Sequence, residues 1–350
     1  MARSLGWIVV LGTAWILVSP LTTLVPVNAH LSVSNLRAAK VAPLNGTALN
    51  WTAVPVGRLH PPKLYSPVMV YDAADGYLLY VGGKTNPSPS YSVILIETWS
   101  YLGGRWHDLT NTSDAPRPEY FFDLTYDAAD RQVVLYGGIP YGARWLPLTE
   151  TWTYSAGIWR NLTHVVHPPP SEHAAMAYDA KDGYVVRYGG YWPHKRTYEN
   201  ETWIFRGGNW SEIFPKTPPP AEWLASMAYD AKAQCLVLAG GTTKLGPLNG
   251  TWEFSGGNWT PALSAGLPPT SSLTAMTYDS KAGVVVILGI WAGVPFAGTW
   301  IFDNGVWKNI TGASGPPTVG EYSTMGYDTA RGYVLWFYGW KHSSTAWKLS

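Results

Sequence analysis

The chain has 350 residues, among them 20 Trp, 22 Tyr, 36 Gly and 28 Pro, and only 13% of the residues are charged. This composition favours many short strands joined by tight turns over a helical protein. The 24 basic and 23 acidic residues leave a net charge of +1, without the basic excess by which proteins bind nucleic acid or anionic lipid. We therefore expect no nucleic-acid partner.

Residues 1–29 are predicted to be a secretory signal peptide. Arg3 precedes an apolar stretch over residues 5–18, and the small-residue end at 27–29 is typical of a cleavage site. The alternative is an uncleaved anchor over residues 5–27, long enough to span a bilayer at about 20 residues. Only such an anchor would attach the chain to a membrane. In either case residues 30–46 form a linker and the remainder is extracellular or on the cell surface.

Glycosylation signals agree with export. Nine of the 13 Asn begin an Asn-x-Ser/Thr triplet, and we predict that they carry glycans. The nine are Asn45, Asn50, Asn111, Asn161, Asn200, Asn209, Asn249, Asn258 and Asn309. The single Cys235 excludes an intrachain disulfide, so the stability of the fold must come from packing.

A repeat of about fifty residues follows the linker. Tyr-Asp pairs begin at Tyr71, Tyr126, Tyr178, Tyr229, Tyr278 and Tyr327. Each pair is followed by a turn, an apolar run that in four repeats ends in a double Gly, and a Trp-centred run. A second Trp, from Trp106 to Trp307, closes each of the first five units, whereas the sixth unit stops at Ser350.

Trp51 supplies the missing position, because it precedes Tyr71 by the same interval that separates each closing Trp from the next Tyr-Asp pair. We therefore predict an all-β fold over residues 47–350. It is a six-bladed β-propeller of four-stranded blades, whose ring is closed by an N-terminal strand that joins the last blade.

These residues resemble kelch-repeat propellers, the architecture that also forms the central domain of galactose oxidase. The resemblance rests on the double Gly, the Thr-Trp-x-Tyr/Phe motif of the third strand and the spaced Trp of the fourth. Ile290 and Trp340 replace the second Gly in the last two repeats. The resemblance implies the fold, but the family includes binding modules, scaffolds and a few enzymes, so it does not imply an activity.

The candidate site is the face formed by the loops that enter the innermost strands. Six or seven residues before Tyr-Asp stand carboxylates with aromatic neighbours, and we interpret them as a ligand-binding ring round the channel mouth. They are Glu119, Tyr120, Glu172, His173, Glu222, Trp223, Glu321 and Tyr322, joined by Tyr65 and by Trp192 and Arg196 from the loop after a double Gly. The alternative is that the Glu side chains bind loop backbone and the aromatic residues fill the taper of the ring.

We interpret the chain as an extracellular binding protein that recognises carbohydrate or a surface protein through this face, because exposed aromatic rings offer stacking surfaces. One alternative is a carbohydrate-active enzyme of epimerase or lyase type that uses the mouth carboxylates. Another is a structural envelope component. No catalytic residue, metal site or cofactor is predicted, since the chain contains no nucleophile elbow, phosphate loop or zinc-protease helix.

Overall fold

The computed structural model describes residues 49–350 except 63–65, 83–95, 111–114, 117–118, 141–145, 249, 263–274, 292–293, 313–322 and 338–344. Residues Leu49–Ser350 form one compact unit. The regular structure of the described residues is entirely β. None of these residues belongs to a helix that is long and apolar enough to cross a membrane.

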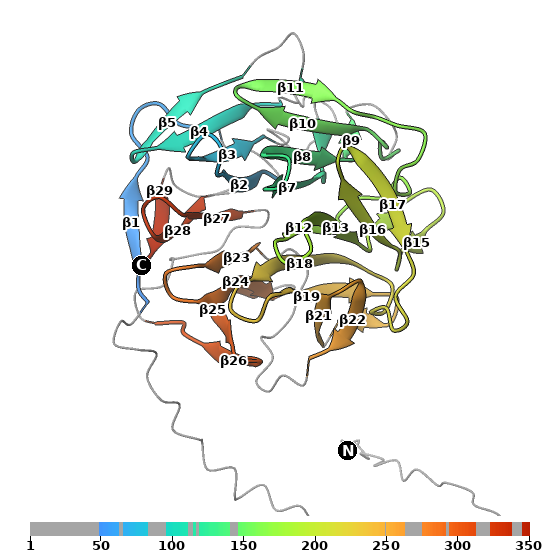
Figure 1. Ribbon diagram of the computed structural model, residues 1–350. Helices are drawn as coiled ribbons and strands as arrows, with labels where there is room; N and C mark the ends of the chain where they lie inside the picture. The colour runs from blue at the N-terminus through green and yellow to red at the C-terminus, as the bar shows by residue number, and fades with distance from the viewer. Residues whose placement is uncertain are drawn as a thin grey trace, which may run out of the picture. The chain divides into compact units, whose positions relative to one another are not determined.

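Six sheets, each with four consecutive antiparallel strands, are arranged as the blades of a propeller (Figure 1). From the channel outwards, blade 1 consists of β2 (Val68–Asp72), β3 (Tyr77–Val81), β4 (Thr98–Leu102) and β5 (Arg105–Asp108), and blade 2 of β7 (Asp123–Asp127), β8 (Gln132–Tyr136), β10 (Thr151–Ser155) and β11 (Ile158–Asn161). Blade 3 consists of β12 (Ala175–Asp179), β13 (Tyr184–Tyr188), β16 (Thr202–Arg206) and β17 (Asn209–Ile213), and blade 4 of β18 (Glu222–Asp230), β19 (Cys235–Thr243), β21 (Thr251–Ser255) and β22 (Asn258–Pro261).

Blade 5 consists of β23 (Ala275–Asp279), β24 (Val284–Trp291), β25 (Val294–Asp303) and β26 (Val306–Asn309), and blade 6 of β27 (Thr324–Asp328), β28 (Tyr333–Phe337), β29 (Thr345–Leu349) and β1 (Trp51–Pro55). Three short pairings are added: β6 (Glu119–Tyr120) with β9 (Ile139–Pro140), β14 (Tyr191–Trp192) with β15 (Thr197–Tyr198), and β20 (Gly246–Pro247) with β19. The predicted all-β, six-bladed propeller is confirmed.

Strand β1 occupies the outer edge of blade 6. It pairs antiparallel with β29, with Trp51 opposite Leu349 and Ala53 opposite Trp347. At the inner end of the blades, each innermost strand contacts the next, and β27 contacts β2. The two ends of the described chain therefore lie in the same blade.

The Asp of each Tyr-Asp pair caps the turn that follows it. In blades 1 to 5 its Oδ1 accepts two backbone N–H groups of the turn, as Asp72 does from Ala74 and Asp75 at 3.0 and 3.2 Å. Gly76 ends the first turn with φ of 77°, a conformation that favours glycine. The repeated Asp residues are therefore structural, as side chains before a turn commonly are.

Neighbouring blades are joined by packing and by a repeated hydrogen bond. The second strands are almost wholly buried, and their apolar side chains form clusters that each combine two blades. The closing Trp of one blade donates its indole N–H to the Thr of the Thr-Trp motif in the preceding blade, as Trp159 does to Thr98 at 3.1 Å. Trp51 makes the same bond to Thr299 at 2.8 Å. A strand from the start of the chain thus has the contacts of an ordinary fourth strand.

Two glycosylation triplets also have a structural role. The Oδ1 of Asn161 accepts the N–H of Thr163, and the Thr163 hydroxyl in turn accepts the N–H of Thr151. Asp108 and Thr110 make the same pair of bonds in blade 1. Because Asp serves there as well as Asn, the motif needs the side-chain oxygen, and its recurrence does not depend on glycans.

Candidate functional site

The loop face consists of the entry segments before the innermost strands (119–122, 171–174 and 222–225 among the described residues) and the segments after the double glycines. Strand pairings connect the two kinds of segment: β6 pairs with β9, Glu172 bridges to Tyr191, and the start of β18 pairs with the end of β19. These pairings give the entry segments a fixed register, which decides the direction of each side chain.

The register corrects the expectation that the carboxylates of the ring occupy equivalent positions. Tyr120, Glu172 and Trp223 all pair with the residue directly after a double Gly. Glu222 lies one residue earlier, at the position that Ser171 occupies in blade 3. Since a shift of one residue turns a side chain to the other face of a strand, Glu172 and Glu222 project into different surroundings.

The residue after this position has a left-handed backbone in each of four blades. Ser66, Phe121, His173 and Leu224 have φ between 55° and 66°, and all four line the central cavity. The N–H of Leu224 donates to the carbonyl of His173 at 3.0 Å, and that of His173 donates to the carbonyl of Phe121 at 3.5 Å. Left-handed conformations of such residues cost on the order of 1–3 kcal/mol each, and here they accompany a chain of backbone bonds round the channel mouth.

A continuous row of aromatic side chains crosses the loop face from blade 2 to blade 4, and we call it the aromatic row. Ring centroids lie 4.6 Å apart for Tyr120 and Phe121, 3.9 Å for Phe121 and His173, and 5.6 Å for His173 and Trp223. Trp223 then contacts Tyr191 at 5.0 Å and Tyr198 at 6.3 Å. All of these side chains except Phe121 are only half-buried. The structure thus brings together four predicted site residues, Tyr120, Glu172, His173 and Trp223.

Glu172 lies among these rings without a positive partner. Its backbone exchanges two 2.9 Å hydrogen bonds with Tyr191. The side chain is 5% exposed, and Oε2 is fully buried with no hydrogen-bond partner. Burial raises the pKa of the Glu172 carboxyl to about 7. The pKa of Tyr120 rises to about 12, chiefly through burial and secondarily through the negative charge of Glu172.

His173 is neutral at physiological pH, because burial lowers the pKa of its imidazole to about 3. It therefore contributes a ring to the row and no charge.

Glu222 is 1% exposed and lies between blades 3 and 4. Its carboxyl fills the space where a side chain on Gly241 would stand, and its backbone carbonyl closely approaches Gly189. Burial alone holds its pKa well above the usual range, so the group is protonated at neutral pH. Glu222 was predicted as a ligand-binding carboxylate, but the structure places it inside the blade interface, away from the aromatic row.

An ion pair that the sequence interpretation missed joins blades 2 and 3. Arg187 donates from Nε to Asp123 at 2.8 Å and from Nη2 to the Ser171 hydroxyl at 2.9 Å, and both charged residues are almost fully buried. Burial raises the pKa of Asp123 to about 6 despite the opposing effect of Arg187. The available signal was an Arg within the apolar run of β13.

The hairpin of β14 and β15 projects from blade 3 and carries the other two predicted site residues. Trp192 is half-buried, and the Lys195 ammonium lies 3.6 Å from its ring centroid. Arg196 is exposed at the end of the turn, with φ of 52°. One face of Trp192 is therefore occupied by a cation of the same hairpin.

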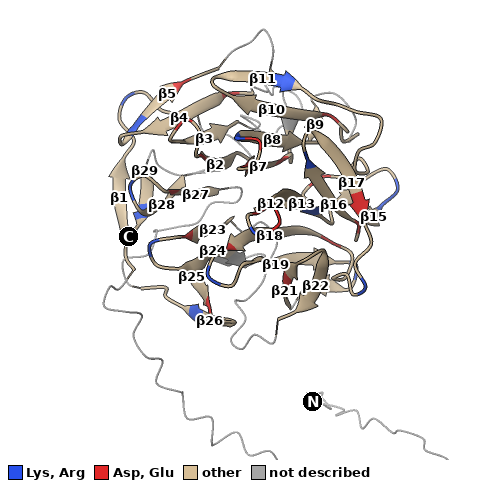
Figure 2. Ribbon diagram, viewed as in Figure 1, with Lys and Arg blue, Asp and Glu red and all other residues tan. Residues whose placement is uncertain are grey.

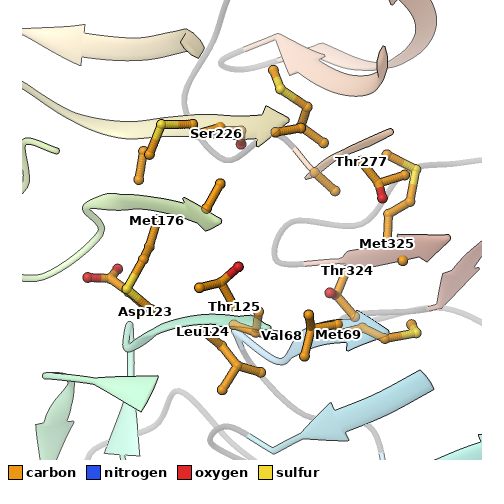
Figure 3. Close-up of a pocket in the computed structure, with 18 of the residues that line it drawn as sticks. Val68, Met69, Asp123, Leu124, Thr125, Met176, Ser226, Thr277, Thr324 and Met325 are labelled. Atoms are coloured by element: carbon orange, nitrogen blue, oxygen red, sulfur yellow. The ribbon is translucent and has the colours of Figure 1, made fainter. Parts of the chain in front are cut away.

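The central cavity has a volume of about 590 Å³ and is enclosed by all six innermost strands. Figure 3 shows the hydroxyl groups of Thr125, Ser226 and Thr277 directed into the cavity, whereas the Asp123 carboxylate turns towards the gap between β7 and β12. Asp123 is the only Asp, Glu, Lys or Arg among the described residues that line it. Because Arg187 balances this charge, the channel is lined by neutral groups.

The remaining predicted residues are placed as follows. The side chain of Glu119 and all of Tyr65, Glu321 and Tyr322 lie outside the described residues, as do Asn45, Asn111 and Asn249. The other six predicted glycosylation sites, Asn50, Asn161, Asn200, Asn209, Asn258 and Asn309, are exposed. Figure 2 shows basic and acidic residues interspersed over the blades. In the part of the chain that the structure describes, no three His, Cys, Asp or Glu side chains are grouped for metal binding.

The fold and site define the class of this protein as a six-bladed β-propeller of four-stranded antiparallel blades. No protein-family model matches the chain, and no curated protein matches it.

Proposed function

We propose that the chain is an extracellular kelch-type propeller that binds carbohydrate through its loop face. The aromatic row supports this proposal most directly, because half-buried rings in a continuous row provide flat apolar surfaces on which sugar rings stack. The left-handed backbone at four equivalent positions of the channel mouth adds to it, since such strain concentrates at functional sites. A rigid ring of blades would hold these loops in place for recognition.

A glycan-array screen of residues 30–350 tests this function. Any hit is then titrated against Trp223→Ala and Tyr198→Ala, and each variant should weaken binding about two- to tenfold, the value of one aromatic contact. Phe214→Ala is the matched control, because Phe214 is 82% exposed and lies outside the row. Melting curves report on folding. Array binding that survives both row variants unchanged would place the site elsewhere, and capture of a surface protein with no glycan hit would favour a protein ligand.

A carbohydrate-active enzyme of epimerase or lyase type is the second candidate. The pKa of about 7 at Glu172 favours it, since a group that titrates near neutral pH can both accept and donate a proton. Incubation of each array hit with the protein, followed by mass spectrometry and NMR of the sugar, distinguishes the two. An unaltered sugar supports binding alone, whereas a product that Glu172→Gln no longer forms supports the enzyme.

A further inference from the structure

Glu172 is an almost fully buried carboxyl for which the described residues provide no counter-charge. The described ion pairs join Arg187 to Asp123, Lys232 and Lys308 to Asp303, and Arg331 to Asp328. The adjacent His173 is neutral for the reason given above. Lys195, on the neighbouring hairpin, lies over the ring of Trp192. A buried carboxylate without a partner is strongly unfavourable, so a positive ligand group would be stabilised there.

The surroundings of this carboxyl are suited to a cation of a particular kind. Tyr191 is bound to the Glu172 backbone, and its ring lies against that of Trp223 at 5.0 Å. His173 follows directly in the chain and also contacts Trp223. Aromatic faces attract cations, and they attract alkylated ammonium groups in preference to strongly hydrated metal ions because the apolar substituents pack against the rings. The half-burial of Trp223 and Tyr191 leaves these rings accessible from solvent.

We propose that Glu172 and the adjacent rings of the aromatic row bind an organic ammonium group. The carboxylate pairs with the charge, and Trp223 and Tyr191 contact its alkyl substituents. This inference deepens the proposed function, since it assigns a charge to the ligand of the same face. The ammonium group belongs either to an amino sugar or to a choline-type headgroup, and the experiment separates these sources.

Two matched pairs of probes are titrated calorimetrically at pH 7.5. Choline is compared with 3,3-dimethylbutan-1-ol, which has the same shape without the charge, and D-glucosamine is compared with N-acetyl-D-glucosamine. We expect choline to bind at least about tenfold more tightly than its neutral analogue. Glu172→Gln should weaken choline binding about ten- to a hundredfold, as expected for the loss of a charged contact. Glu212→Gln, the same change on the outermost strand of blade 3, should have no effect.

The pH dependence gives a second measurement. Choline has a fixed charge, so only the protein titrates, and the carboxyl must ionise to bind it. With the pKa of Glu172 at about 7, the choline Kd should be constant above that pH and rise about tenfold for each pH unit below it. Glu172→Gln should abolish this dependence.

The outcomes distinguish this inference from the proposed function. Tighter binding of glucosamine than of its N-acetyl form supports both. Choline binding with no response to either sugar supports the ammonium site and removes carbohydrate as the ligand. Equal binding within both pairs, or N-acetylglucosamine binding without choline binding, overturns the ammonium site while carbohydrate recognition stands. No binding of any probe overturns the ammonium site.

Discussion

Replacement of Glu172 by Gln is expected to stabilise the propeller at pH 8 and to leave its stability nearly unchanged at pH 4. Burial raises the pKa of this carboxyl from 4.5 to about 7 in the folded protein. Because the folded pKa is the higher one, ionisation opposes folding. The penalty is absent below the unfolded value, grows between the two pKa values and is constant above about 7. At 1.36 kcal/mol per pKa unit it amounts to roughly 3 kcal/mol at pH 8.

Urea denaturation of the two proteins at pH 4 and pH 8 measures this effect. The other titrating groups contribute equally to both proteins, so the difference between them isolates Glu172. Glu199→Gln is the matched control, because Glu199 lies on the same face and its carboxylate accepts a hydrogen bond from Thr197 at 2.8 Å. A gain of about 1–3 kcal/mol at pH 8 alone is expected. An equal difference at both pH values, or a loss at pH 8, would refute the argument that the carboxyl is buried without compensation.

Four further predictions concern the ring and its surface. Arg187→Met should destabilise the protein by about 3–5 kcal/mol in urea titrations, because it leaves Asp123 buried without a partner, and adding Asp123→Asn should recover most of the loss. Trp159→Phe, which keeps an aromatic ring but removes the indole N–H, should cost about 1 kcal/mol, and no change would show that the Trp–Thr bond between blades is dispensable. Deletion of residues 47–56 should expose the edge of β29 and cause unfolding or aggregation, so an unchanged melting temperature would contradict closure by β1. Mass spectrometry of the secreted protein should find a glycan on the exposed Asn209, and its absence from every exposed triplet would remove the glycosylation prediction.

The blade architecture could be predicted from the sequence because each blade repeats residues with a local physical task. The Asp of Tyr-Asp caps its own turn, and the glycines of the hairpins adopt positive φ wherever they occur. Trp51 could be assigned to the last blade for a similar reason, since its interval to Tyr71 matched that of the other closing Trp residues. These features depend on short stretches of chain, and counting along the sequence reveals them.

The site was predicted less well because it depends on register and on contacts between blades. Glu172 and Glu222 stand six and seven residues before their Tyr-Asp pairs, and this difference of one residue sends them to opposite faces. The difference is visible in the sequence, but its meaning requires the strand pairing. The pair of Arg187 and Asp123 was not predictable, since nothing local to either residue indicates that the two blades bring them together. The surroundings of Glu222 likewise come from two different blades.

Hydrogen–deuterium exchange with and without a saturating hit from the glycan array tests the central claim most directly, because it locates the binding face whatever the ligand is. The account predicts slowed exchange in residues 171–173, 191–198 and 222–224, which carry the aromatic row. The turns that follow the Tyr-Asp pairs, at the opposite ends of the innermost strands, should be unaffected. Protection confined to those turns or to the outermost strands would contradict the assignment of ligand binding to the loop face.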